Sequence, residues 1–237
     1  MQRYYFKESI LFEDNDLVII NKPEYMSTLF DRSTPVNILD EAKGYVPDAQ
    51  VCHRLDKETS GVLAIAKNQF AYRHMSMQFE HRQVEKLYHA VVDGIVTYNN
   101  EKVDKAIRIL PNGLVKIDKT EGKDAYTIFN KVKNYRRHTL VECRPVTGRM
   151  HQIRIHLASL GSPITGDESY GGKPFYLSEY KKKYKVNKYE DERPVMGRVA
   201  LHAHALIFKD LKGESHRVEA PYPKDFGVLI KQLEKFS

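Results

Sequence analysis

Cysteines and long apolar runs are scarce in this chain. None of the apolar runs in its 237 residues approaches the roughly 20 residues that a helix needs to span a bilayer. The stretch from Met1 to Lys7 has no apolar segment followed by a small-residue cleavage site, so no signal peptide is expected. The only cysteines, Cys52 and Cys143, are expected to be small buried side chains rather than a disulfide. These absences favour a reduced, cytoplasmic setting with no membrane partner.

The composition is that of a folded protein with an excess of positive charge. Hydrophobic residues make up 41% of the chain and charged residues 29%, and the length is ample for a substantial buried core. Lys and Arg number 38 against 31 Asp and Glu, which gives a formal net charge of +7. Phosphates attract such a surface and release condensed counterions on binding, so a polyanionic partner is favoured.

Short strands predominate in the predicted secondary structure. Strands are expected within 10–23, 62–66, 85–94, 106–117, 125–132, 138–143 and 201–208, and helices over 36–43, 68–82, 150–159 and 226–236. Because strands and helices do not alternate regularly, the pattern predicts an α+β fold whose sheet is mixed and largely antiparallel. We expect one domain over 1–237 with its core at about 10–210. The segment 178–194, dense in Lys, Tyr and Glu, is predicted to be an exposed insertion.

One carboxylate stands out from the rest. Asp56 lies between Arg54 and Lys57, shortly before the strand expected at 62–66, which makes it a candidate nucleophile or acid/base group at a strand edge. The alternative is structural: Asp56 would pair with Arg54 or cap the turn that contains Thr59.

A second basic segment runs from Pro145 to Ala158. If it is helical from Met150, then Arg149, His151 and Arg154 form a basic side, which could serve an active-site carboxylate and an RNA backbone. The backbone N–H groups near Thr147 could hold a phosphate where the chain enters the helix. An ordinary solvated basic face is the alternative.

Tyr88 and the histidines have ordinary explanations too. Tyr88 could fill the core or stack on a base. A metal site is not expected, because His151 and His156 are five residues apart and do not share a helix face. His202 and His204 would share a strand face, which is compatible with a metal but not diagnostic.

Taken together, these segments closely resemble the RluA family of RNA pseudouridine synthases. The resemblance covers about Leu11 to Phe208. It rests on His53-Arg54-Leu55-Asp56 with Thr59-Ser60-Gly61, Lys86-Leu87-Tyr88 with Gly94, Gly148-Arg149 with His151-Gln152-Ile153-Arg154-Ile155-His156, Gly166-Asp167 with Tyr170-Gly171-Gly172, Leu201-His202-Ala203 with Leu206 and Phe208, and Asn21-Lys22-Pro23.

The resemblance implies that the protein isomerises uridine to pseudouridine within RNA, in an active-site cleft across the sheet. Three residues map onto the family's catalytic positions. Asp56 corresponds to the essential aspartate, Tyr88 to the active-site tyrosine that contacts the target base, and Arg154 to the arginine that pairs with the aspartate. The reaction needs no redox change and no group donor, so neither a metal nor an organic cofactor is expected.

Other positions are expected to bind the RNA. Arg54 corresponds to the residue associated with prising the nucleotide out of the RNA, and Leu201 to an apolar wall of the site. His53, Arg149, His151 and Lys67 are further expected to contact the substrate, with Arg149 and Lys67 gripping phosphates. The expected substrate is a stem-loop of ribosomal or transfer RNA, and the expected oligomeric state is a monomer.

The departures from the family pattern are few. Glu24 to Met26 replace a glycine that the family has soon after Asn-Lys-Pro, and Lys209-Asp210 replace a His-Pro pair. The residues before Ile10 are too few to form the S4-type RNA-binding domain of many relatives. Two other hypotheses stay open: a catalytically silent RNA-binding or assembly factor of the same fold, and a metal-dependent phosphoesterase built on the histidines.

Overall fold

The computed structural model describes residues 4–31, 36–181, 184 and 191–237 and divides into two compact units. The first unit comprises 1–88 and 202–222, and the second comprises 89–201 and 223–237. The chain therefore passes from one unit to the other inside one strand, between Tyr88 and His89, and returns at the start of another, between Leu201 and His202. One catalytic domain over 1–237 stays a prediction.

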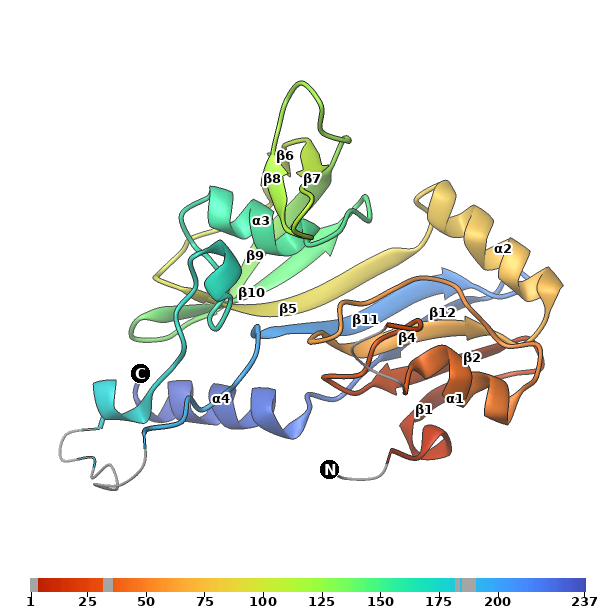
Figure 1. Cartoon of the computed structure of the whole chain (residues 1–237), viewed down its shortest axis with the longest axis horizontal. Helices are drawn as coiled ribbons and strands as arrows, with labels where there is room; N and C mark the ends of the chain where they lie inside the picture. The colour runs from red at the N-terminus through yellow and green to blue at the C-terminus, as the bar shows by residue number, and fades with distance from the viewer. Residues whose placement is uncertain (1–3, 32–35, 182–183, 185–190) are drawn as a thin grey trace. The chain divides into compact units, whose positions relative to one another are not determined.

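The first unit is a mixed sheet with two helices (Figure 1). Its strand order is β1-β2-β4-β11, with β3 paired to β4 and β12 paired to β11. The pairing of β4 with β11 is parallel, whereas β1 with β2, β2 with β4, β3 with β4 and β11 with β12 are antiparallel. Its elements are β1 Ile10–Glu13, β2 Leu17–Lys22, α1 Ile38–Tyr45, β3 Gln50–Val51, β4 Ser60–Ala66, α2 Gln69–Glu80, β12 Ser215–Glu219, the first part of β5 (Glu85–Asp93), nearly all of β11 (Leu201–Lys209) and a 3-10 turn at Phe6–Ser9.

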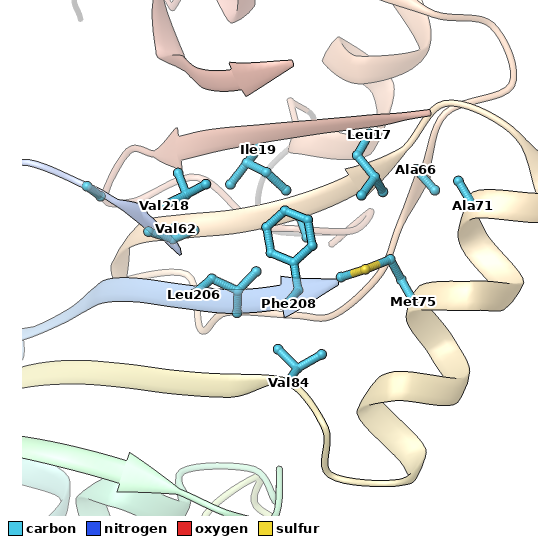
Figure 2. Packing of buried hydrophobic residues seen from close by; sticks show 12 residues of the cluster. Leu17, Ile19, Val62, Ala66, Ala71, Met75, Val84, Leu206, Phe208 and Val218 are labelled. Atoms are coloured by element: carbon cyan, nitrogen blue, oxygen red, sulfur yellow. The ribbon is translucent and has the colours of Figure 1, made fainter. Parts of the chain in front are cut away.

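Every residue of β4 is buried, because apolar residues cover both faces of the strand. Alternate side chains point to opposite faces. Val62, Ala64 and Ala66 therefore join one apolar cluster, shown in Figure 2, while Leu63 and Ile65 join another on the opposite face. This double burial fixes the register of β4 and with it the position of the loop that precedes the strand.

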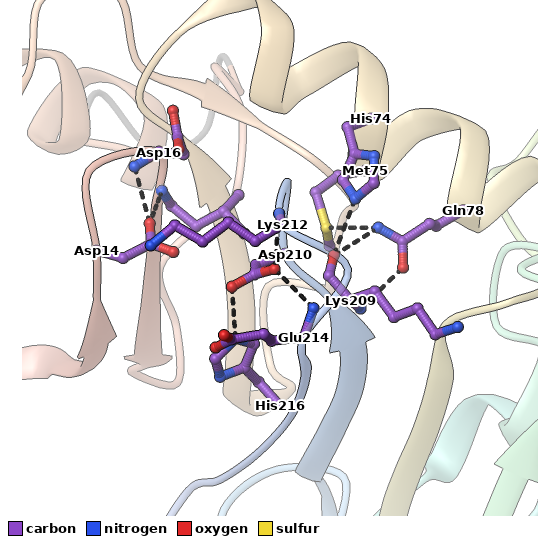
Figure 3. A network of polar contacts seen from close by, with 11 residues as sticks. Asp14, Asp16, His74, Met75, Gln78, Lys209, Asp210, Lys212, Glu214 and His216 are labelled. Atoms are coloured by element: carbon purple, nitrogen blue, oxygen red, sulfur yellow. Dashed lines mark hydrogen bonds and ion pairs between the residues drawn. The ribbon is translucent and has the colours of Figure 1, made fainter.

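Helix α2 is held against the first of these clusters at both ends. Its N-cap is Asn68, as predicted, whose side-chain oxygen accepts from the Ala71 N–H at 2.9 Å. Near its other end, the side chains of His74 and Gln78 donate to the Lys209 carbonyl oxygen at 3.0 and 2.8 Å (Figure 3). The helix is thus tied to β11 as well as to the core.

The strands of the second unit follow the order β5-β10-β9-β6, in which β9 pairs antiparallel with both β10 and β6, and β7 and β8 form a separate hairpin. Helix α4 buries Phe226, Leu229 and Leu233, and its Asp225 pairs with the buried Arg198 at 2.7 Å. The elements are β6 Glu101–Asp104, β7 Ile107–Ile109, β8 Val115–Ile117, β9 Tyr126–Asn134, β10 His138–Pro145, α3 Gln152–Ser159, α4 Lys224–Lys235, the second part of β5, and 3-10 turns at Glu168–Tyr170 and Leu177–Glu179.

The predicted α+β class with a largely antiparallel sheet is confirmed. The short strands β3, β6 and β12 were not predicted. The helix predicted from Met150 begins at Gln152, because His151 is left-handed with φ 51°. Tyr180, expected in an exposed insertion, is buried and stacks on Phe175 at a centroid distance of 4.7 Å. Residues 182–183 and 185–190 of that insertion lie outside the described residues. In the described part of the chain, no helix has the length and apolar character to cross a membrane.

Candidate active site

Asp56 lies in the loop between β3 and β4, and the backbone just before it is clamped. The Thr28 hydroxyl accepts from the Leu55 N–H at 3.2 Å and donates to the Leu55 carbonyl oxygen at 2.9 Å. The Thr59 N–H closes the turn on the Asp56 carbonyl oxygen at 3.0 Å. A single hydroxyl thus fixes both backbone groups of the residue next to the carboxylate, so this loop presents Asp56 from a defined backbone.

The fully buried Lys22 holds the same loop from β2. Its ammonium donates to the carbonyl oxygens of Pro23 at 2.7 Å, Met26 at 2.9 Å and Lys57 at 3.3 Å. A buried charge is costly unless it is hydrogen-bonded, and these three acceptors match the three N–H donors of the ammonium. Lys22 therefore fastens the chain on the C-terminal side of Asp56, as Thr28 does on the N-terminal side.

The start of β4 is packed directly on β11. Gly61 has φ +116°, and a Cβ on it would lie 2.1 Å from the Ala203 carbonyl oxygen, so only glycine fits. Next to it, the Ser60 hydroxyl lies 3.0 Å from Nδ1 of the buried His202, whose Nε2 lies 3.2 Å from the Ala220 carbonyl oxygen. Since a carbonyl only accepts, Nε2 carries the proton and Nδ1 accepts from Ser60. His202 of β11 thus binds β4 through one ring nitrogen and the residue after β12 through the other.

His53 fixes the Asp56 loop to β4. Its Nε2 accepts from the Ala64 N–H at 3.1 Å, and its ring lies 4.9 Å from that of Phe79. Burial lowers the pKa of His53 to about 3, with a further contribution from the charge of Lys86. A neutral imidazole that accepts a backbone hydrogen bond cannot grip a phosphate with that nitrogen. Through this nitrogen His53 positions the Asp56 loop, and its contact with the substrate stays a prediction.

Tyr88 lies in the same unit, against the same apolar cluster as Leu55. The cluster also includes Leu63 and Ala203, so the residue before Asp56, the middle of β4 and the β5 tyrosine share one packing environment. Lys86 precedes Tyr88 by two positions and thus shares its side of the strand. Burial lowers the pKa of Lys86 to about 8.

The two remaining predicted contacts of this unit lie in different places. Arg54 is exposed in the Asp56 loop, as a group that meets RNA must be. Lys67 follows the last residue of β4, whereas the Asp56 turn leads into the first residue of that strand, Ser60. Lys67 pairs with Glu13 at 2.9 Å and donates to the Asp14 carbonyl oxygen at 2.8 Å. Lys67 is thus tied to the β1–β2 hairpin, and its contact with the substrate stays a prediction.

In the second unit, Arg154 is buried on α3 and makes a two-pronged ion pair. Its Nε and Nη2 each donate to one oxygen of the buried Asp167, both at 2.7 Å. The guanidinium also lies 5.0 Å from the ring centroid of Tyr170. This geometry fixes the plane of the guanidinium. The pairing of Arg154 with Asp56 stays a prediction.

His151 and Tyr170 complete this support. The Nδ1 of His151 lies 2.8 Å from the Tyr170 hydroxyl, and the two rings meet edge to face. His156 on α3 is fully buried between the Thr127 hydroxyl and the Lys105 carbonyl oxygen, at 2.9 and 3.0 Å, and burial lowers its pKa. His156 is thus a core residue.

The predicted phosphate grip at the start of α3 is partly wrong. The Gln152 side-chain oxygen accepts from the Arg149 N–H at 2.9 Å and from the Thr147 hydroxyl at 2.7 Å, so that backbone donor is already used. The Arg149 side chain is exposed and donates through Nε to the Asp124 carbonyl oxygen at 3.0 Å. Leu201, predicted as an apolar wall, is buried, and its carbonyl oxygen accepts from Arg198 at 3.2 Å.

A metal site on the predicted histidines finds no support in the described part of the chain. The one group with suitable spacing in residues 4–31, 36–181, 184 and 191–237 is Asp210, Glu214 and His216, and it contains none of His151, His156, His202 or His204. Asp210 already accepts from the Lys212 and Glu214 N–H groups and contacts His216 at 2.9 Å (Figure 3). This trio closes the β11–β12 turn.

Lys22, Thr28 and Asp167 are the residues that sequence reasoning missed. Lys22 and Asp167 belong to segments that carried the resemblance, but neither was given a role. Thr28 had no signal, because its partner Leu55 is 27 positions away.

Comparisons with known proteins agree with this architecture. Residues 16–159 match the family model described as RNA pseudouridylate synthase. "Ribosomal large subunit pseudouridine synthase D" of Xanthomonas campestris is 36% identical over 97% of this chain and 70% of its own length. An "Uncharacterized RNA pseudouridine synthase" of Aquifex aeolicus is 37% identical over 97% of this chain and 74% of its own length. The solved structure of "Human RNA Pseudouridylate Synthase Domain Containing 1" matches with a TM-score of 0.70 and 27% identity, over 91% of this chain and 83% of that one.

The fold and the similar proteins are therefore those of an RNA-modifying isomerase. The chain belongs to the RNA pseudouridylate synthase family. It is an RNA pseudouridine synthase, which converts uridine to pseudouridine in RNA. The resemblance that the sequence motifs gave is thereby confirmed, and a catalytically silent factor is disfavoured.

Proposed function

We propose that Asp56, Tyr88 and Arg154 catalyse the isomerisation, and that the substrate is a stem-loop of large-subunit ribosomal RNA. The observation that supports this assignment best is that three side chains of the first unit hold the Asp56 loop and the strand after it. A buried ammonium, a threonine hydroxyl and a neutral imidazole each bind backbone next to this one carboxylate or to the strand that follows it. Such support is expected where a reacting group must be held in a productive geometry.

The chemistry follows from the bonds that must change. The target uridine leaves its stack, at a cost of a few kcal/mol, and exposed Arg54 beside the carboxylate offsets part of that cost by binding phosphate. The Asp56 carboxylate then either attacks C1′ of the ribose or removes a sugar proton to give a glycal, and the C1′–N1 bond breaks. The uracil rotates and forms the C1′–C5 bond. In the first route the C1′–O bond to Asp56 breaks in the same step, and in the second route Asp56 returns the proton to the sugar. C5 then loses its proton and N1 gains one, so both routes conserve all atoms and electrons.

Tyr88 and Arg154 have distinct roles in this proposal. The ring of Tyr88, packed on the Leu55 cluster, stacks on the extruded base, and its hydroxyl takes part in the later proton transfer. Arg154, with its plane set by Asp167, acts on the carboxylate of Asp56. Arg149 and His151 contribute to RNA binding from the second unit.

The choice of ribosomal RNA rests on relatives. Several relatives that are 32–36% identical carry the name "Ribosomal large subunit pseudouridine synthase", followed by C or D. A transfer RNA is the competing substrate. Mapping pseudouridines in total RNA from cells with and without the gene separates the two, because a site lost from transfer RNA alone overturns the ribosomal assignment. The protein is proposed to act as a monomer, without metal, in the cytoplasm.

The decisive experiment replaces the carboxylate. Asp56→Asn and Asp56→Ala should abolish release of tritium from RNA that carries [5-³H]uridine, while the Kd for the same RNA stays within about tenfold. The matched control is Asp48→Asn, an exposed carboxylate before β3, which should keep full turnover. Turnover in a clean Asp56→Ala preparation would contradict the assignment.

A further inference from the structure

Helix α2 presents a mixed aromatic and cationic face that the reaction above does not use. Phe70, Arg73, Met77 and His81 follow one another at spacings of three and four residues, so they lie along one side of the helix. All four are exposed, and Phe70 reaches 80% exposure. Together with Arg82 these residues are called the α2 stripe.

The stripe is held rigidly by the opposite face of the same helix. Ala71 and Met75 are fully buried, and Figure 2 shows both pointing from α2 into the core of the first unit. The cap by Asn68 and the two side-chain hydrogen bonds to Lys209 fix both ends. The twelve-residue helix therefore presents the stripe along roughly 18 Å without any loop that must be ordered first.

Helix α2 also contacts the Asp56 loop. The Phe79 ring of this helix lies 4.9 Å from the His53 ring, and His53 adjoins the exposed Arg54. Phe79 follows Phe70 by about two and a half helical turns, so this contact lies on the opposite side of α2 from the stripe. RNA that reaches the stripe therefore extends beyond the nucleotide that is modified.

Arg82 is an unusual choice for its position. The Gln83 N–H bonds the Gln78 carbonyl oxygen at 2.8 Å, which closes the helix with Arg82 in the left-handed conformation, at φ 57°. Glycine or asparagine normally occupies this place, because a larger side chain is strained there. An exposed arginine at a strained position indicates a role for its side chain outside the fold.

We propose that the α2 stripe binds the RNA substrate outside the loop that carries the target uridine. The proposal rests on the proposed function, since it requires that this chain modifies a structured RNA. The chemistry fits RNA: Phe70 offers a ring on which a base stacks, and Arg73 and Arg82 offer positive charge to phosphates. The helix itself has a single acidic residue, Glu80, and the chain as a whole carries a net charge of +7.

The test measures equilibrium binding to the RNA fragment that contains the mapped uridine, at several salt concentrations. Phe70→Ala should raise Kd about tenfold. Arg73→Gln should raise Kd and reduce the slope of log Kd against log salt by about 0.7 to 0.9, the value for one phosphate contact. The matched controls are Val228→Ala and Lys231→Gln on the exposed side of α4, which should change neither quantity.

Arg82→Gly separates binding from folding. It should raise the midpoint of thermal unfolding, because glycine relieves the strain, and yet weaken RNA binding and lower the salt slope. An RNA fragment trimmed to the modified loop should bind wild type and Phe70→Ala equally well. If Phe70→Ala and Arg73→Gln bind the longer fragment like wild type, the proposal is overturned, and the stripe serves a protein partner or none. If the wild-type protein binds the RNA but shows no turnover, that result counts against the proposed function and not against this surface.

Discussion

The buried ammonium of Lys22 lies 3.3 Å from the carbonyl oxygen of Lys57, the residue that follows Asp56. A strand residue thus holds a loop 35 positions further along the chain. The contact links the Asn-Lys-Pro segment to the aspartate motif through one side chain. It also means that the loop and β2 must form together for either to be satisfied.

Replacement of Lys22 tests this link. Lys22→Met keeps the volume but leaves buried carbonyl oxygens without their donor, so the free energy of unfolding should fall by about 3 kcal/mol. Turnover at saturating RNA should fall by about tenfold or more, because the backbone beside Asp56 is loosened. Urea unfolding and tritium release measure the two effects. The control Lys119→Met removes an exposed ammonium, and equal losses in both variants would contradict the clamp.

Two glycine substitutions distinguish the stability cost of a steric clash from the cost of backbone strain. Gly61 and Gly113 both have positive φ, +116° and +80°, but a Cβ on Gly113 would meet nothing within 4 Å. Gly113→Ala should therefore cost about 1 kcal/mol for strain alone. Gly61→Ala should lose more than about 4 kcal/mol or fail to give soluble protein, because its Cβ meets the backbone of Ala203. Similar unfolding midpoints for the two variants would show that β4 and β11 can move apart cheaply.

The acid stability of the protein should depend on His53. The ring is neutral in the folded protein, with a pKa of about 3, whereas an unfolded chain takes up the proton near pH 6.5. Acid therefore favours the unfolded state. The contribution of His53 is complete above pH 6.5 and is lost as the pH falls toward 3, by up to about 1.4 kcal/mol per pH unit. His53→Gln keeps an acceptor for the Ala64 N–H but does not titrate, so its stability should fall less steeply over this range. Chemical unfolding at several pH values compares the two, and parallel curves would refute the assignment.

The Arg154–Asp167 pair should be sensitive even to a conservative substitution. Arg154→Lys keeps the charge but loses the two parallel hydrogen bonds to a buried carboxylate, so the free energy of unfolding should fall by about 2 kcal/mol. Arg217→Lys at the half-exposed pair with Glu219 provides the control, with an expected change below about 0.5 kcal/mol. Thermal unfolding of both proteins measures the difference. Equal shifts would mean that the buried geometry contributes nothing.

Local signals in the sequence were enough for most of the elements. Three examples are the apolar run of β4, the Asn68 cap of α2 and the Pro-Asn-Gly turn between β7 and β8. Each depends on residues that are close in sequence, so each can be predicted from a short segment of the chain. The short strand β12 was missed because Ser215–Glu219 is mostly polar and depends on its partner β11 for its pairing.

The candidate site was predictable in its residues but not in its contacts. Family motifs pointed to Asp56, Tyr88 and Arg154, whereas the residues that hold the Asp56 loop act over long separations. Lys22 would be expected on the surface, since lysine is rarely buried without partners. The contacts of Lys67 with Glu13 and Asp14 were likewise not predictable, because these partners lie more than 50 positions away in the chain.

Each unit contains one of the two thiols, Cys52 in the first and Cys143 in the second, and neither forms a disulfide. Burial raises the pKa of Cys52 to about 12 and raises that of Cys143 as well. Alkylating reagents react with the thiolate, so neither cysteine should be alkylated readily while the protein is folded. Alkylation of each cysteine therefore reports the unfolding of the unit that contains it. The order in which the two cysteines are modified gives the order in which the two units unfold.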